Sequence, residues 1–410
     1  GIDVPVTVNE NPGVRGTEII DAVDDYPLPW HPDHPYMFVP EGVEYKLKKL
    51  RRTQPDKPMM YSEFESGWFT LFGDDLPSCR IGEIPPAWID ALTKTVIGMG
   101  VNALNNYMFC GGTNFAYNQA RPNTSSHDWM APVGEWGQLA PHYYVIRRIG
   151  GFIETLGSQL AICPPRHDLI DGDGEEISVF RRIGERSAFL FPRNIGATEA
   201  ERRFQIDLPD SGETLAFPRK GAYTVAPFSA AILPINVQLT PKGPRLLYAT
   251  CQLFRAYANK DEIIVVLFEQ PGFSAEMCLV LDPSDIGADV SGPAEHEWLG
   301  DGRLYLNFTH QDETQVVHIH AQHPITLVLT SPDRAGRTWE LSLGDDRLPL
   351  ISNLYLLRGA EVADGYVVAE VDVEPEATVE IEYPCSQAPR QILLDGEEIP
   401  FSFDPGDGLT

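Results

Sequence analysis

Short apolar runs alternate with helical segments through the first 157 residues, and this alternation restricts the fold more than any other feature. Runs with the length and content of strands lie at 2–8, 17–23, 59–64 and 101–109. Helical segments are predicted at 41–52, from Pro86 onwards, and from 143 to about 156. Strands that alternate with helices form a parallel sheet covered by helices, so we predict an α/β barrel.

Four strands cannot close such a barrel. Eight are needed, and an open half would expose edge strands and one face of the core. We therefore interpret residues 1–157 as the C-terminal half of a (β/α)8, or TIM, barrel that contains strands five to eight. The chain begins at Gly1 without Met and already within a strand, so we expect the native N-terminus to be missing.

The third strand carries a carboxylate near its end. This run is short, mostly apolar and bounded by Pro58 and Gly67, which leaves no room for a helix. Glu63 lies near its carboxyl end, the edge where the active sites of barrel enzymes are found. A buried, ion-paired glutamate is the structural alternative; we favour a catalytic carboxylate.

Three polar segments extend this pattern. Residues 62–68 read Ser-Glu-Phe-x-x-Gly-Trp, residues 107–115 read Tyr-Met-Phe-x-Gly-Gly-Thr-Asn-Phe, and a third segment occupies 126–137. In this order they resemble glycoside hydrolase family 35, the β-galactosidase family that also contains exo-β-glucosaminidases. The first two segments are long and specific.

The resemblance implies a retaining exo-β-glycosidase that releases terminal β-D-galactosyl residues with two carboxyl groups about 5 to 5.5 Å apart. It implies that Glu63 is the nucleophile, at the end of barrel strand seven. The family's general acid follows an Asn on strand four, upstream of Gly1, so we expect these 410 residues alone to be inactive. Asn9 and Glu10 imitate that dipeptide, but too few residues separate them from Glu63 for three intervening βα units. Glu65 is a further weak candidate, because it projects from the same strand end as Glu63.

Other residues match the family one at a time. Trp68 would form an apolar wall near the sugar, and the hydroxyl of Tyr107 would lie near the nucleophile. Trp129 stands where many members have a sugar-binding tyrosine, which leaves galactose recognition open although stacking on a sugar stays available. His127, Glu135 and Asn114 also fall within the pattern, the last two equally as braces of loops.

Two alternative functions stay open. An exo-β-D-glucosaminidase of the same family would need an acidic group beside the amine of the sugar, and Asp128 is one option. A non-catalytic carbohydrate-binding relative is the alternative from another class.

The resemblance implies no metal and no cofactor. The histidines at 31 and 34, and those at 318, 320 and 323, lack a nearby Cys or carboxylate that would complete tetrahedral spacing, so solvated or hydrogen-bonded histidines are the default.

Beyond residue 157 the apolar pattern changes to a period of two. A hairpin is predicted around 183–186, and the Asp-Gly pairs at 301, 364 and 395 mark further hairpins. We expect antiparallel β-sandwich domains and no helix longer than two turns. The predicted division is 1–157 for the half-barrel, 158–240 for a small β domain, 241–345 for a β-sandwich, and 346–410 for a β-rich, incomplete domain.

Composition excludes some partners. The net charge of −28 comes from 59 acidic and 31 basic residues, which argues against nucleic acid and anionic membranes as partners and suits a carbohydrate. No apolar run approaches the roughly 18 residues of a membrane span. Six scattered cysteines without a C-x-x-C pair are interpreted as buried free thiols, which slightly favours a reducing, cytoplasmic location. The sequence does not indicate the oligomeric state.

Overall fold

The computed structural model describes residues 4–10, 14, 17–25, 40–66, 85–118, 125–128, 131–172, 175–241, 243–299, 301–363, 366–375, 378–382 and 390–402. The chain divides into two compact units. Unit 1 contains Gly1–Ile146 and Gln159–Leu233, and unit 2 contains Arg147–Ser158 and Pro234–Thr410. The domain boundaries expected at 157, 240 and 345 stay a prediction.

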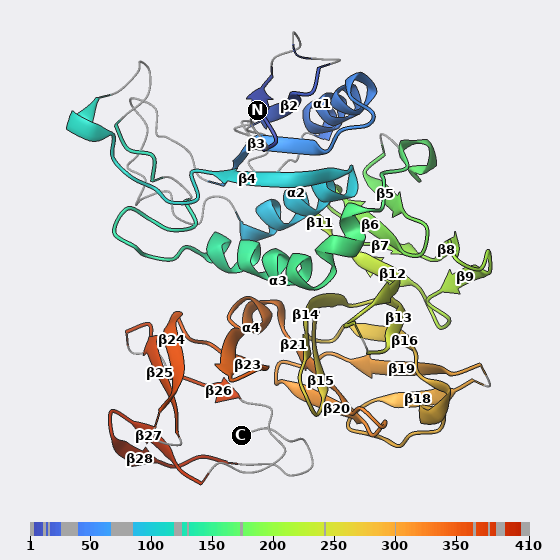
Figure 1. Ribbon diagram of the computed structural model, residues 1–410, viewed down its shortest axis with the longest axis vertical. Helices are drawn as coiled ribbons and strands as arrows, with labels where there is room; N and C mark the ends of the chain where they lie inside the picture. The colour runs from blue at the N-terminus through green and yellow to red at the C-terminus, as the bar shows by residue number, and fades with distance from the viewer. Residues whose placement is uncertain are drawn as a thin grey trace. The chain divides into compact units, whose positions relative to one another are not determined.

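Unit 1 is built on a parallel sheet in the order β1-β2-β3-β4 (Figure 1). Its elements are β1 (Thr7–Asn9), β2 (Ile20–Asp25), α1 (Pro40–Thr53), β3 (Met59–Glu65), α2 (Pro86–Gly98), β4 (Val101–Tyr107) and α3 (Pro141–Ala161), of which the middle belongs to unit 2. The predicted alternation of four strands and three helices is confirmed, and α3 extends beyond its predicted end at 156.

Helix α2 is more buried than its sequence pattern predicts. Pro86 starts the helix at a position where no amide hydrogen bond is lost, as expected. Its polar residues are buried as well as its apolar stripe, because β6 (Ala188–Asn194) and β11 (Ser229–Ala230) cover the other face. Lys94 and Asp90 form a buried ion pair at 2.5 Å, which satisfies both charges one helical turn apart.

The rest of unit 1 contains antiparallel strands. β5 (Ile177–Ile183) pairs with β6 in the hairpin predicted around 183–186, and β11 adds to the other edge of β6. Two further pairs join β7 (Ala200–Arg202) to β10 (Tyr223–Val225) and β8 (Phe204–Asp207) to β9 (Thr214–Phe217). The 3-10 helices η3 (Phe115–Tyr117) and η4 (His167–Leu169) lie in connections.

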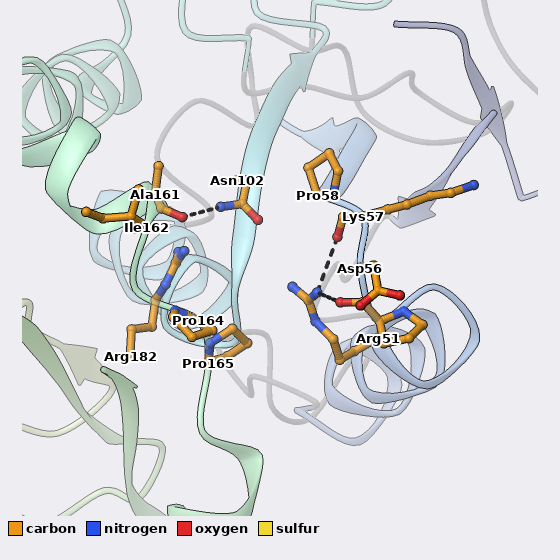
Figure 2. Close-up of a pocket in the computed structure, with 11 residues that line it drawn as sticks. Arg51, Asp56, Lys57, Pro58, Asn102, Ala161, Ile162, Pro164, Pro165 and Arg182 are labelled. Carbon is orange, nitrogen blue, oxygen red and sulfur yellow. Dashed lines mark hydrogen bonds between the residues drawn. The ribbon is translucent and has the colours of Figure 1, made fainter. Parts of the chain in front are cut away.

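Arg182 on β5 holds several segments of unit 1 together. Its guanidinium donates to the carbonyls of Ile97, Val101 and Cys163 at 3.1, 3.1 and 2.8 Å. Burial lowers the pKa of Arg182 to about 10. Figure 2 shows the pocket of about 520 Å³ that Arg182 and Arg51 line, beside the starts of β3 and β4. It therefore lies at the opposite end of these strands from Glu63, away from the edge where barrel enzymes carry their chemistry.

Unit 2 contains mostly β structure. Its strands are β12 (Leu233–Gln238, whose first residue belongs to unit 1), β13 (Arg245–Ala249), β14 (Gln252–Ala258), β15 (Ile263–Phe268), β16 (Ser274–Val280), β17 (Val290–Ser291), β18 (Glu295–Trp298), β19 (Arg303–Thr309), β20 (Gln315–Ile319), β21 (Ile325–Thr330), β22 (Trp339–Leu343), β23 (Asp346–Ser352), β24 (Leu356–Ala363), β25 (Tyr366–Asp372), β26 (Ile381–Glu382), β27 (Ile392–Leu394) and β28 (Glu397–Ile399). Among the described residues, the helices that lie entirely within unit 2 are α4 (Pro332–Gly336) and the 3-10 helix η5 (Pro283–Asp285). Both are short, as predicted.

The sheets of unit 2 confirm the hairpins and correct one feature. β18 with β19, β24 with β25, and β27 with β28 are antiparallel pairs at the predicted Asp-Gly sites. In the sheet β14-β15-β21-β20-β17, however, β15 and β21 pair in parallel. A fully antiparallel prediction was therefore wrong here, because β15 and β21 are distant in sequence and no hairpin sets their direction.

The expectation of six buried thiols is also corrected. Cys163, Cys251 and Cys278 are buried and free, but Cys110 is free and exposed, because it lies in the loop that follows β4 rather than within the sheet. Cys79 and Cys385 lie outside the described residues.

Candidate active site

Polar side chains gather at the carboxyl edge of the parallel sheet. Asn9 ends β1, Asp24 lies near the end of β2, Glu63 lies near the end of β3, and Tyr107 ends β4. Because all four strands run in parallel, these ends meet at one edge of the sheet.

A β-bulge turns Glu63 towards this site. The register is Val23 with Tyr61 and Asp24 with Glu63 on one side of β3, and Leu104 with Tyr61 and Asn106 with Phe64 on the other. β3 thus has one more residue than either neighbour at Ser62–Glu63. Met59, Tyr61 and Phe64 are all fully buried, and the rings of Tyr61 and Phe64 lie 5.2 Å apart on one face. Without the extra residue, strict alternation would place Glu63 on that apolar face.

Neighbouring strands hold the bulge in place. Asn105 on β4 donates through Nδ2 to the carbonyl of Ser62 at 2.8 Å. The backbone N–H of Ser66 donates to the carbonyl of Tyr107 at 3.0 Å, and the Ser66 hydroxyl donates to Asn106 at 2.9 Å. The backbone around Glu63 is therefore fixed by hydrogen bonds with β4.

Asn9 connects the two carboxylates of the edge. Its Nδ2 donates to Asp24 Oδ2 at 3.3 Å and to Glu63 Oε1 at 3.5 Å. Its Oδ1 accepts a hydrogen bond from the Ser62 hydroxyl at 2.7 Å. Strands β1, β2 and β3 thus contribute one connected polar group.

Burial and charge shift two pKa values in this group. Burial raises the pKa of Asp24, the charge of Glu63 raises it further, and the hydrogen bond from Asn9 opposes both. Burial also raises the pKa of Tyr107, followed by the charges of Glu63 and Asp24. The Tyr107 phenol therefore keeps its proton and can donate to developing negative charge.

Of the other predicted site residues, the structure describes Glu10 and Glu65 but not the two tryptophans. Glu10 follows β1 with a positive φ of 46° and forms an exposed ion pair with Lys46 at 3.5 Å. Glu65 is fully buried within β3. Trp68 and Trp129 lie outside the described residues.

The loop after β4 is braced by its own polar residues. Asp128 Oδ1 accepts from the backbone N–H of Glu135 at 2.6 Å, and Glu135 accepts from the Thr113 hydroxyl at 2.8 Å. Asn114 donates to the carbonyl of Asn118 at 2.8 Å, and the backbone N–H of His127 donates to Gly112. Burial raises the pKa of Asp128.

A histidine in β20 and the one just after it have hydroxyl partners. His318 contacts the Thr326 hydroxyl at 3.1 Å and His320 contacts the Ser291 hydroxyl at 3.0 Å. Within the described ranges, no group of three His, Cys, Asp or Glu side chains is arranged to hold a metal ion. His31 and His34 lie outside those ranges.

Of the helices in the described part of the chain, none is long and apolar enough to cross a membrane.

The sequence interpretation missed the contributions of Asn9, Asp24 and Ser62. A signal existed for the first two, because each is a polar residue at the carboxyl end of a predicted parallel strand. The part played by Ser62 depends on the bulge, which the sequence does not reveal.

Comparison with known proteins finds one matching family. The model of "Glycosyl hydrolases family 35" matches residues 2–153, the segment that contains the parallel sheet and Glu63. Over residues 2–153 the chain matches glycosyl hydrolase family 35. The edge formed by β1–β4 is thus part of the matched region.

Relatives extend the similarity beyond the matched region. A "Probable beta-galactosidase B" of Talaromyces marneffei is 23% identical, over 96% of this chain and 42% of its own length. The protein of the same name in Emericella nidulans is 25% identical, over 96% of this chain and 40% of its own. The chain thus spans about two fifths of the length of these relatives. Among solved structures, "Gamma-CGTASE" from alkalophilic Bacillus clarkii covers 89% of this chain and 59% of its own at 12% identity; its TM-score of 0.27 is too low to define a shared fold.

Proposed function

We propose that this protein is a retaining exo-β-glycosidase that hydrolyses terminal β-D-galactosyl residues, with Glu63 as its nucleophile. The observation that carries the proposal is the bulge in β3, which turns the Glu63 carboxylate away from the buried apolar face and towards a polar edge. The names of the family 35 relatives support the galactoside as substrate.

In the proposed first step, a Glu63 oxygen attacks the anomeric carbon and forms a glycosyl ester. The bond from that carbon to the leaving oxygen breaks, and a general acid gives the oxygen its proton. In the second step, water attacks the anomeric carbon, the same group takes the proton of the water, and the ester bond to Glu63 breaks. Two inversions retain the β configuration.

We propose that the general acid comes from a part of the barrel other than β1–β4. Glu10 is occupied in an exposed ion pair with Lys46, and Glu65 is buried on the nucleophile's own strand. This proposal follows from interpreting β1–β4 as strands five to eight of a (β/α)8 barrel. The interpretation of the later sheets as β-sandwich domains is likewise a proposal.

The alternative glucosaminide is less well supported. An acidic group that receives the amine of the sugar must be ionised and accessible. Asp128 already accepts the backbone N–H of Glu135, and burial raises its pKa, which favours the uncharged form.

The test uses the protein at its natural length, with nitrophenyl β-galactoside and nitrophenyl β-glucosaminide as substrates. Glu63→Gln should lower kcat on the galactoside by about 10³-fold or more, whereas the exposed control Glu18→Gln should leave it unchanged. A 2-fluorogalactosyl probe should label wild-type Glu63. If the protein binds galactose but neither turns over nor becomes labelled, it is a carbohydrate-binding relative and the hydrolase proposal is wrong.

A further inference from the structure

Asn9 occupies a central position in the polar group beside Glu63. It is contributed by β1, two strands away from Glu63, and its Nδ2 lies within 3.5 Å of oxygens from both Asp24 and Glu63. The contact to Glu63 is long for a hydrogen bond, as is common in unliganded active sites, where such contacts tighten when substrate is bound.

Chemistry determines the orientation of the Asn9 amide. Ionised carboxylates only accept hydrogen bonds, so the NH2 end of the amide must face Asp24 and Glu63. The carbonyl end then needs a donor, and the Ser62 hydroxyl supplies it at 2.7 Å. Ser62 is the neighbour of Glu63 within the bulge, so the residue that displaces Glu63 also orients its partner.

We propose that Asn9 is a positioning residue for the nucleophile: its amide, oriented by Ser62 and anchored on Asp24, holds the Glu63 carboxylate in place and keeps the two carboxylates ionised side by side. This inference rests on the proposed role of Glu63 as the nucleophile. Asn9 acts through Glu63 and needs no contact with the substrate.

The charges around the pair make such a donor necessary. Asp24 and Glu63 are register partners, and Glu10 adds a further negative charge that raises the pKa of Asp24. Lys46 on α1 opposes this effect, and its Nζ donates to the backbone carbonyl of Asp24 at 2.8 Å. Tyr107 is the other titratable group that senses the pair, and its raised pKa leaves it neutral. A hydrogen bond to an ionised carboxylate favours the ionised form, so Asn9 offsets part of the repulsion.

The experiment compares Asn9→Ala, Asn9→Asp and Ser62→Ala in the natural-length protein, with Asn353→Ala as matched control. The Nδ2 of Asn353 is likewise a hydrogen-bond donor, but its acceptor is the backbone carbonyl of Thr378 in unit 2. We expect Asn9→Ala to lower kcat about 10- to 100-fold with little change in KM. The acid limb of the kcat/KM profile should move to higher pH by about half a unit to one unit, because an interaction that favours ionisation is lost. Asn9→Asp, which keeps the shape but adds a charge, should move that limb further.

Two results strengthen the assignment. Ser62→Ala should give a smaller loss than Asn9→Ala, because the amide stays present but is less well oriented. In Asn9→Ala/Asp24→Asn the acid limb should return towards the wild-type pH, because the repelling charge has been removed. Circular dichroism and melting temperature establish that each variant folds, and Asn9→Asp serves as the near-isosteric variant if Asn9→Ala does not.

Failure of this inference differs from failure of the proposed function. If wild-type Glu63 is labelled by the fluorosugar but Asn9→Ala and Asn9→Asp keep the wild-type kcat and pH profile, Asn9 has no positioning role. If Glu63 is never labelled, the proposed function itself is wrong. If Asp24→Asn loses turnover on substrates with poor leaving groups yet keeps it on activated ones, Asp24 is the general acid, and the anchoring role given to it here is overturned.

Discussion

Asp24 and Glu63 are register partners on adjacent parallel strands, so two carboxylates share one edge of the sheet and one amide donor. This arrangement at Asp24 lowers the stability of the folded protein. Its Oδ1 is buried and finds no hydrogen-bond partner among the described residues, and burial together with the charge of Glu63 raises its pKa. An acid whose pKa is raised by folding destabilises the folded state when ionised.

Asp24→Asn should therefore stabilise the protein at neutral pH. Because the folded state binds the proton of Asp24 more tightly than the unfolded state, the stability of wild type falls as pH rises from about 3.8 through the raised pKa of Asp24. The variant lacks this titration, so its melting temperature should exceed that of wild type at pH 7 and approach it near pH 4. Equal melting temperatures across this range would contradict the expectation, and Asp285→Asn on the surface provides the control.

Tyr107→Phe should lower kcat/KM about tenfold to a hundredfold, because the phenol is a protonated donor at the site. The charges of Glu63 and Asp24 together with burial raise the pKa of Tyr107, so the hydroxyl does not titrate in the assay range. The basic limb of the rate profile should thus be the same in both proteins. The exposed Tyr45 on α1 offers the control Tyr45→Phe. A basic limb that disappears in Tyr107→Phe would show that the phenol does titrate.

Local sequence signals predicted the elements that carry the site. Pro58 and Gly67 bounded β3, Pro86 started α2, and the Asp-Gly pair at 395 marked the hairpin of β27 and β28. Each signal acts within a few residues, through the backbone restrictions of proline and glycine. It therefore does not depend on how the rest of the chain folds.

Features that depend on distant partners were not predictable. The bulge at Ser62–Glu63 is held by Asn105, some forty positions later in the chain, and the amide of Asn9 reaches Glu63 across β2. The parallel pairing of β15 with β21 also joins segments that no local signal connects. The sequence therefore located the strand end and the carboxylate, but not the backbone irregularity that determines where the carboxylate points.

Arg182→Lys should destabilise unit 1 by about 2 to 4 kcal/mol. One ammonium group cannot reach the carbonyls of Ile97, Val101 and Cys163 together, so buried acceptors lose their donor. Urea denaturation followed by tryptophan fluorescence measures the loss. Arg202→Lys is the control, because among the described residues Arg202 donates to a single carbonyl, that of Glu201. A change below about 0.5 kcal/mol would mean that the carbonyls find other partners.

His310 should make unit 2 sensitive to mild acid. The side chain is fully buried, with its ring 5.6 Å from that of Phe308, and burial lowers the pKa of His310 to about 4, more than the Thr330 backbone raises it. In the unfolded chain the imidazole takes up a proton near pH 6.5. The contribution of the neutral, buried ring is therefore fully present above about pH 6.5 and is lost as pH falls towards 4, up to about 3 kcal/mol.

Urea midpoints measured between pH 7.5 and 4.5 test this pH dependence. His310→Leu removes the titrating group while keeping an apolar side chain of similar size, so its midpoint should fall less steeply with acid than that of wild type. His296→Leu is the control, because His296 on β18 is exposed and should leave the slope unchanged. Parallel slopes for His310→Leu and wild type would mean that groups other than His310 dominate the acid sensitivity. A reduced slope for His310→Leu alone would locate that sensitivity at the end of β19.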